Sequence, residues 1–132
     1  MSDAIVSFRG LGLSEAMLKA LEQKGYGYPT TIQAEAIPHF LEWKDVIAKA
    51  PTGTGKTFAF GIPMIEHIDA ENEAVQALIL APTRELAIQI GDELRDLLTY
   101  YNGIRVAVLY GGAGIGGQIK QLERKPQIVV AT

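Results

Sequence analysis

Four segments of the chain carry apolar residues on both of their alternating faces. These segments are residues 45–50 (DVIAKA), 76–81 (QALILA), 105–110 (RVAVLY) and 127–132 (QIVVAT). A parallel sheet that helices cover on both sides requires such strands, because neither face of the sheet meets water. We therefore predict four buried, parallel strands.

Segments with the apolar spacing of helices alternate with these strands. The predicted helices lie at residues 57–68, 84–101 and 115–124. Asn102-Gly103 provides a stop after the second of them, whereas Gly61 and Pro63 are expected to bend or divide the first. Strands that alternate with helices, joined by right-handed crossovers, predict an α/β domain with a parallel sheet flanked by helices.

Two further helices are predicted nearer the N-terminus. Ser14 is a suitable N-cap for the first, and Gly25 ends it. The second begins at Thr30 and runs into Pro38. We accordingly assign residues 1–42 to an N-terminal helical segment and residues 43–132 to the strand-containing domain.

Composition places the chain among globular proteins. It has 132 residues, of which 48% are hydrophobic and 20% are charged, and this suits one domain with a sizeable core. The apolar runs are far shorter than the roughly 18 residues that span a bilayer. The N-terminus lacks the basic and apolar regions of a signal peptide. We therefore expect a soluble, cytoplasmic protein.

Charge and cysteine usage exclude several kinds of site. The chain has no cysteine, which excludes disulfides and thiolate metal sites, and its two histidines, His39 and His67, are isolated in the sequence. The net charge of −3 argues against a protein that holds nucleic acid by bulk positive charge. Any nucleic acid must be bound through a few placed groups.

A glycine-rich loop at residues 50–57 (APTGTGKT) follows the first predicted strand. Gly53 and Gly55 allow the backbone to approach a phosphate group and direct N–H groups at it. Lys56 reaches the outer phosphates, and the Thr57 hydroxyl group can ligate Mg²⁺. The strand before the loop and the helix after it fit the context of a nucleotide-binding P-loop.

Two features restrict what this loop can do. Ala50 occupies the position at which the general P-loop pattern has its first glycine. Hydrolysis by P-loop enzymes also needs a carboxylate at the end of another buried strand. The other predicted strands end at Ala81, Tyr110 and Thr132, and no acidic residue stands at these ends. The chain therefore has a phosphate-binding loop without the acid.

Two polar residues allow more than one interpretation. Thr30 and Gln33 have the spacing of a capping box, but the Gln33 amide could instead recognise the edge of an adenine base. Thr83 is a suitable N-cap, and it also follows a strand at the edge where ligands of such sheets bind. Spacing alone does not choose between these roles.

Together these motifs resemble those of the DEAD-box RNA helicases, and the resemblance runs from Phe8 to Thr132. Phe8 corresponds to an isolated upstream aromatic residue, and residues 25–33 resemble the Q motif. Residues 50–57 resemble motif I, which in this family begins with Ala. The remaining matches are residues 82–87 (PTRELA) with motif Ia, Gly111-Gly112 and Gln118 with the GG element, and Thr132 with the start of motif Ib.

The resemblance implies a RecA-like domain and assigns roles to individual residues. Gln33 would read adenine, with Phe8 and Tyr26 forming the apolar face beside the base. ATP and Mg²⁺ would be held by Ala50, Pro51, Thr52, Gly53, Thr54, Gly55, Lys56 and Thr57, the last through its hydroxyl group. RNA phosphate and sugar groups would lie against Pro82, Thr83, Arg84, Gly111, Gly112 and Thr132. Such contacts are independent of sequence and need no basic surface.

The resemblance also implies parts that these residues do not include. They are the Asp-Glu-Ala-Asp strand, the Ser-Ala-Thr segment and a second RecA-like domain with arginine fingers. We therefore expect this chain to bind ATP weakly, to hydrolyse it hardly at all, and to self-associate through an exposed sheet edge. The alternatives are an unrelated P-loop NTPase or kinase, and a non-catalytic module that binds nucleotide or RNA.

Overall fold

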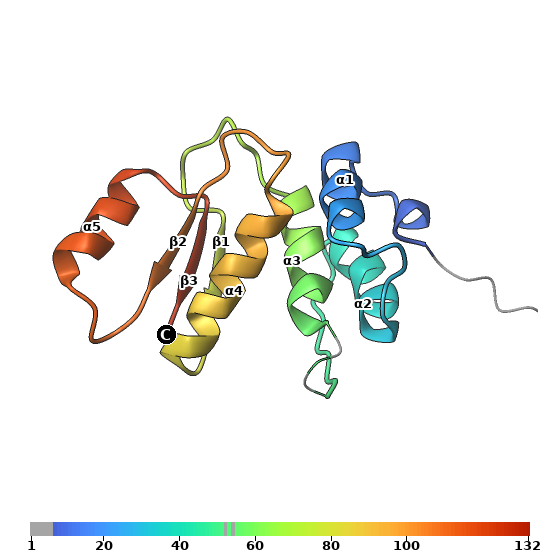
Figure 1. Cartoon of the computed structure of the whole chain (residues 1–132), viewed down its shortest axis with the longest axis horizontal. Coiled ribbons are helices and arrows are strands. Elements are labelled where there is room, and N and C mark those ends of the chain that lie inside the picture. The colour runs from blue at the N-terminus through green and yellow to red at the C-terminus, as the bar shows by residue number, and fades with distance from the viewer. Residues whose placement is uncertain (1–6, 52, 54) are drawn as a thin grey trace, which may run out of the picture. The chain divides into compact units, whose positions relative to one another are not determined.

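The computed structural model describes residues 7–51, 53 and 55–132 (Figure 1). The chain divides into two compact units, Met1–His67 and Ile68–Thr132. This division differs from the motif-based boundary between residues 42 and 43, which remains a prediction. In the part of the chain that the structure describes, no helix is both long and apolar enough to cross a bilayer.

The first unit is helical. Its elements are the 3₁₀ helix η1 (Phe8–Leu11), α1 (Glu15–Gln23), α2 (Thr31–Leu41) and α3 (Lys56–Glu66). The predicted caps are confirmed, because the Ser14 hydroxyl group accepts a hydrogen bond from the Met17 N–H and the Thr30 hydroxyl group accepts one from the Gln33 N–H. Each of these bonds satisfies a backbone donor at a helix start.

Helix α3 is continuous from Lys56 to Glu66, so of the two predicted effects of Gly61 and Pro63, bending or dividing the helix, division does not occur. Gly61 and Pro63 lie inside it, and both are buried. The proline removes one helical hydrogen bond. Helices α2 and α3 pack against each other along much of their length, and buried apolar contacts of this kind offset the loss of one bond.

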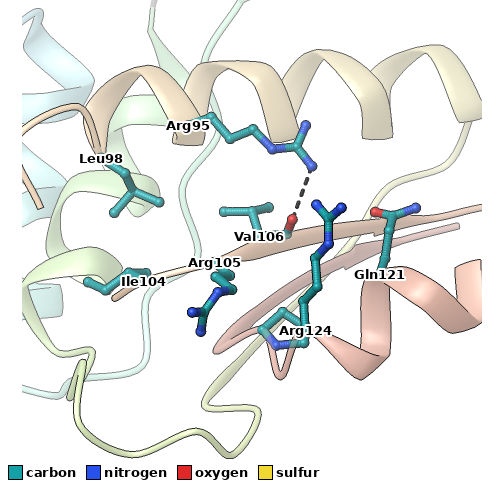
Figure 2. A pocket seen from close by; sticks show the side chains of 8 residues that line it. Arg95, Leu98, Ile104, Arg105, Val106, Gln121 and Arg124 are labelled. Carbon is teal, nitrogen blue, oxygen red and sulfur yellow. Dashed lines mark hydrogen bonds between the residues drawn. The ribbon is translucent and has the colours of Figure 1, made fainter. Parts of the chain in front are cut away.

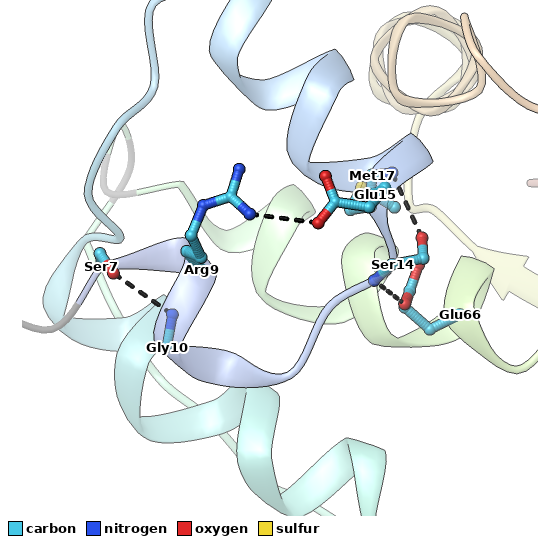
Figure 3. A network of polar contacts seen from close by, with 7 residues as sticks. All are labelled: Ser7, Arg9, Gly10, Ser14, Glu15, Met17 and Glu66. Atoms are coloured by element: carbon cyan, nitrogen blue, oxygen red, sulfur yellow. Dashed lines mark hydrogen bonds and ion pairs between the residues drawn. The ribbon is translucent and has the colours of Figure 1, made fainter.

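A polar contact ties the end of α3 to the start of α1. The Glu66 carboxylate accepts hydrogen bonds from the Ser14 N–H at 2.8 Å and from the Ser14 hydroxyl group at 2.9 Å (Figure 3). The same hydroxyl group accepts the Met17 N–H at 3.3 Å. The N-cap of α1 is therefore fixed by a residue of α3.

The predicted strand at residues 45–50 is not formed. This segment has no regular secondary structure, and the Ile47 side chain is fully exposed. A strand exists only where its backbone pairs with a neighbour, and within the described residues this segment has no such neighbour. Its apolar composition therefore does not suffice to make it a strand.

The second unit is an α/β fold, which confirms the predicted fold class. Its elements are β1 (Ala77–Leu80), α4 (Arg84–Leu97), β2 (Val106–Leu109), α5 (Ile115–Glu123) and β3 (Ile128–Ala131). Among the described residues the three strands form one parallel sheet in the order β1-β3-β2. Leu80 and Leu109 both align with Ala131, so the three strands end at the same edge of the sheet.

Helix α4 packs on β2 and β3, and α5 lies against β2 (Figure 1). Gly91 permits the close approach of α4, because a Cβ atom at this position would overlap the Val108 side chain. The core of this unit consists of Ala81, Ala87, Ile90, Leu94, Leu97, Leu98, Ala107, Val108, Ile128, Val129 and Val130.

The outer edge of β2 is closed by side chains instead of a strand. The hydrogen bonds run from Arg95 to the Val106 carbonyl group (3.0 Å), between the Gln121 amide and both backbone groups of Val108 (2.9 and 3.2 Å), and from the Tyr110 N–H to Gln118 (3.0 Å). These bonds satisfy the backbone groups that an added strand would otherwise pair with.

The outer edge of β1 differs. In the described part of the chain β1 pairs only with β3, and its Leu78 and Leu80 side chains are exposed. Strand β1 therefore combines an unpaired backbone edge with exposed apolar side chains.

Candidate nucleotide and RNA sites

The glycine-rich loop leads directly into α3. Gly53 and Gly55 both have a left-handed backbone, with φ of 85° and 84°. Gly55 is the N-cap of α3, and among the described residues no side chain caps this helix. Lys56 is its first residue and is exposed, and Thr57 follows, half-buried. The start of α3 therefore offers backbone N–H groups and a cation to an anion.

Three more residues of the predicted nucleotide site lie in or near this loop. Ala50 is half-buried and Pro51 is exposed. Thr52 and Thr54 lie outside the described residues.

Gln33 connects the second helix to the glycine-rich loop. Its side-chain oxygen accepts the Thr30 N–H at 2.9 Å, and its side-chain nitrogen donates to the Gly55 carbonyl group at 3.1 Å. Its side chain is almost fully buried, with 4% of the residue surface exposed. The capping box is therefore present, and the same amide also fixes the loop.

Phe8 and Tyr26 line one pocket of about 300 Å³, so the structure brings these two predicted residues together. Phe8 is buried, whereas Tyr26 is about half exposed and its ring contacts the Phe58 ring edge-on, with centroids 5.5 Å apart. Tyr26 can present a ring face to a ligand, and Phe8 lies beneath the pocket as support.

A second apolar pocket beside Lys56 was not predicted. It measures about 270 Å³ and is lined by Ile32, Ala36, Phe40, Val46, Ala48, Lys56, Ala59 and Phe60. The signal in the sequence is the spacing of Ile32, Ala36 and Phe40, which places them on one face of α2. That spacing is equally typical of an ordinary core face, so it did not indicate a pocket.

The second unit gathers its predicted RNA-binding residues where the strands end. Thr83 caps α4 by accepting the Leu86 N–H at 3.2 Å. Arg84, the first residue of α4, lies over the Tyr110 ring, with the guanidinium carbon 5.8 Å from the centroid. A Cβ atom on Gly112 would lie 3.9 Å from an Arg84 nitrogen. The residues after β1 and β2 are therefore neighbours.

Thr132 and Pro82 complete this group. The Thr132 N–H donates to the Leu109 carbonyl group at 3.1 Å, so the end of β3 lies beside the end of β2. Pro82 is exposed directly after Ala81, whose N–H donates to the Ala131 carbonyl group at 2.8 Å. The ends of all three strands thus form one surface.

Gln118 fixes the loop that contains Gly111 and Gly112. Its side-chain oxygen accepts the Tyr110 N–H at 3.0 Å, and its side-chain nitrogen donates to the Ala113 carbonyl group at 3.4 Å. One amide therefore holds the residues on both sides of the two glycines. Gly112 has φ of 87°, which favours glycine at this turn.

Two ion pairs on the surface shift the pKa values of their members. A hydrogen bond from Lys44 lowers the pKa of Glu42. The bond between Glu73 and Lys125 lowers the pKa of the carboxyl group and raises that of the ammonium group. All four groups are solvent-exposed, so water screens these interactions and they contribute little to stability.

Comparison with known proteins identifies relatives along nearly the whole chain. The family model described as DEAD/DEAH box helicase matches residues 30–132. The DEAD-box ATP-dependent RNA helicase CshA of Bacillus cereus is 47% identical over 97% of this chain. The ATP-dependent RNA helicase CshA of Limosilactobacillus reuteri is 54% identical over 96%, and DeaD of Escherichia coli is 45% identical over 100%.

A solved structure supports the same relationship. The crystal structure of a DEAD box protein from Methanococcus jannaschii matches with a TM-score of 0.88 and 44% identity, over 96% of this chain and 34% of that one. The curated relatives are much longer, because the chain spans 24%, 25% and 21% of the three helicases named above.

Proposed function

This chain belongs to the DEAD/DEAH box helicase family, and we propose that it forms the ATP-binding and RNA-binding part of an ATP-dependent RNA helicase of the cytoplasm. Such an enzyme would use ATP binding and hydrolysis to separate short RNA duplexes. The observation that carries the proposal is the bond between the Gln33 side chain and the Gly55 carbonyl group, because it joins two predicted parts of one nucleotide site.

ATP would bind with its phosphates at the start of α3. The left-handed glycines expose backbone N–H groups there, and no described side chain occupies them as a cap. Lys56 would contact the outer phosphates, and the Thr57 hydroxyl group would ligate Mg²⁺, which neutralises phosphate charge when bound. Residues 50–54 would contribute the rest of the loop.

The adenine base would lie beside Tyr26 and Gln33. The half-exposed Tyr26 ring offers an apolar face, and buried Phe8 supports the same pocket. Each end of the Gln33 amide already makes one bond to the backbone, so reading adenine would use the second lone pair of its oxygen and the second N–H of its nitrogen, or an exchange of the Gly55 bond. Binding of adenine to Gln33 would thereby alter the hydrogen bond that holds the phosphate-binding loop.

RNA would bind across the strand ends of the second unit. Arg84 would contact a phosphate group, and the Thr83 and Thr132 positions would contact phosphate or sugar. Pro82, Gly111 and Gly112 would permit close approach of the RNA backbone. None of these groups reads a base edge, so binding would be independent of sequence. Hydrolysis would need a carboxylate at a strand end in addition to these groups.

Titration of the chain with a fluorescent ATP analogue tests the nucleotide site. Lys56→Ala should abolish binding or weaken it at least about tenfold, because the cation at the outer phosphates is lost. Lys49→Ala is the matched control, since it removes a nearby exposed cation from outside the motif. Unchanged affinity of the Lys56 variant would refute the P-loop assignment.

A second experiment separates the two roles of Gln33. If Gln33 reads adenine, Gln33→Ala should weaken ATP binding much more than GTP binding. The melting temperature without nucleotide, measured in parallel, shows how much the substitution destabilises the fold. A drop in melting temperature with unchanged preference for ATP would leave only the capping role. Stimulation of hydrolysis in a longer protein by a small phosphoryl acceptor instead of RNA would favour a kinase.

The exposed edge of β1 would pair with the same edge of a second copy. The support is the combination of an unpaired edge with exposed Leu78 and Leu80. Sedimentation velocity over a concentration series should show association that Leu80→Lys removes. A folded monomer at every concentration would defeat this part of the proposal.

A further inference from the structure

A pocket of about 490 Å³ lies at the starts of β2 and β3, away from the strand ends described above (Figure 2). Arg105 and Val106 contribute the start of β2, and Pro126 precedes β3. Arg95 and Arg124 enter from the last turn of α4 and the end of α5. This volume suits a small ligand or a few residues of a peptide.

The described residues that line this pocket include three arginines and no carboxylate. Arg95 donates to the Val106 carbonyl group at 3.0 Å and has Asp92 at 3.6 Å. The Arg124 side chain makes no hydrogen bond or ion pair with other described residues, and in Figure 2 it extends toward the Arg95 guanidinium group. The positive charges of Arg95 and Arg124 repel each other, and an oxyanion relieves that repulsion, whereas Arg105 also interacts with the Glu73 carboxylate outside the pocket lining.

The other residues that line the pocket favour an acidic peptide over a nucleic acid as the bound anion. Leu98, Ile104 and Pro126 give the pocket an apolar wall, and no aromatic ring stands among the described residues that line it. A single-stranded nucleic acid gains affinity by stacking its bases on aromatic rings, which this pocket lacks. A peptide with a carboxylate beside an aliphatic side chain satisfies both the arginines and the apolar wall.

We infer that this pocket is a docking site for an acidic segment of a partner protein, in which Glu or Asp alternates with Leu, Ile or Val. The carboxylates bind Arg105 and Arg124, and the aliphatic side chain packs against Leu98 and Ile104. The pocket lies at the opposite ends of the strands from the RNA-binding residues. A partner can therefore bind here without occupying that surface.

Fluorescence polarisation with the full chain and a short labelled peptide of alternating Glu and Leu tests this inference. The Arg124→Glu and Arg105→Glu variants should each raise the dissociation constant about tenfold or more. Lys120→Glu is the matched control, because Lys120 is exposed on α5 but does not line the pocket. It should change the dissociation constant by less than about twofold. A peptide of alternating Gln and Leu should bind at least about tenfold more weakly.

Several results would overturn the inference. Equal losses in the Lys120 variant would mean that bulk charge alone attracts the peptide. Displacement of the peptide by single-stranded RNA, with the same dependence on Arg105 and Arg124, would assign the pocket to nucleic acid. Arg124 also stands at the end of α5, where a cation favours the helix dipole. A lower melting temperature of the Arg124 variant with unchanged peptide affinity would therefore leave only that helix-stabilising role.

Discussion

Gln33 and Gln118 hold two different motif loops by the same pair of hydrogen bonds. In each case the side-chain oxygen accepts a backbone N–H, from Thr30 at 2.9 Å or Tyr110 at 3.0 Å. In each case the side-chain nitrogen donates to a backbone carbonyl group, of Gly55 at 3.1 Å or Ala113 at 3.4 Å. A side-chain amide has the same kinds of donor and acceptor as a peptide group, so it can bond to the backbone of a loop in the way that a neighbouring strand would.

The two residues differ in burial and in the distance they span along the chain. Gln33 is buried and reaches Gly55, 22 positions away, whereas Gln118 is half-buried and stays within eight positions. Burial makes an unsatisfied polar group costly, because water cannot replace the lost partner. The glycine-rich loop before α3 is therefore held by a bond whose loss costs more free energy, and the loop of Gly111 and Gly112 by a bond that water can replace.

The first prediction concerns Gln33→Glu, which keeps the shape and the acceptor but removes the donor to Gly55. We expect a loss of about 3 kcal/mol in the free energy of unfolding, because a buried carboxylate would face a carbonyl oxygen. Trp43, the only tryptophan of the chain, lies in the same unit and can report its unfolding in denaturant by fluorescence. Gln118→Glu is the matched variant in the second unit, whose unfolding is followed by circular dichroism because Trp43 does not report on that unit. An equal loss in both variants would contradict the difference in burial.

The second prediction compares two left-handed glycines. Gly55→Ala should cost about 2–3 kcal/mol, because φ is strained for alanine and the added Cβ atom would overlap the Gln33 amide. Gly112→Ala should cost only about 1 kcal/mol, since no atom lies closer than 3.9 Å to its Cβ position. Denaturant unfolding of both variants measures the difference. A Gly112 variant as unstable as the Gly55 variant would show that backbone strain dominates over crowding.

The third prediction is the smallest. Gln118→Ala should lower the free energy of unfolding by only about 1 kcal/mol, because water can reach the half-buried groups that Gln118 leaves. The Tyr110 amide proton should nevertheless exchange about fivefold faster, which corresponds to a loss of that size. Hydrogen exchange followed by NMR measures this rate, and the Val108 amide, which Gln121 holds, is an internal reference. An unchanged Tyr110 rate would mean that Gln118 does not hold the loop.

The strands of the second unit were predictable because their residues are apolar on both faces. The helix starts at Ser14, Thr30 and Thr83 were predictable because capping depends on residues close together in sequence. The segment 45–50 shows the limit of this reasoning. Its composition resembles that of the other strands, but a strand also needs a neighbour, and composition does not supply one.

The candidate sites were predictable as motifs but not as contacts. The spacing of Thr30 and Gln33 left two roles open, and the third partner of this pair, Gly55, depends on how α2 and α3 pack. The bond between Gln118 and Tyr110 depends on where α5 lies against the edge of β2. Local sequence carries no information on either arrangement, because both follow from packing between elements.

The contact between Ser14 and Glu66 constrains how the first unit folds. The two residues are separated by 52 positions, and both Ser14 groups bond to the same carboxylate. Such a contact forms only after a long loop has closed, and closure of long loops slows folding. Helix α1 would therefore fray until α3 has formed. During synthesis, α1 gains its full stability only after the ribosome has added the residues up to Glu66.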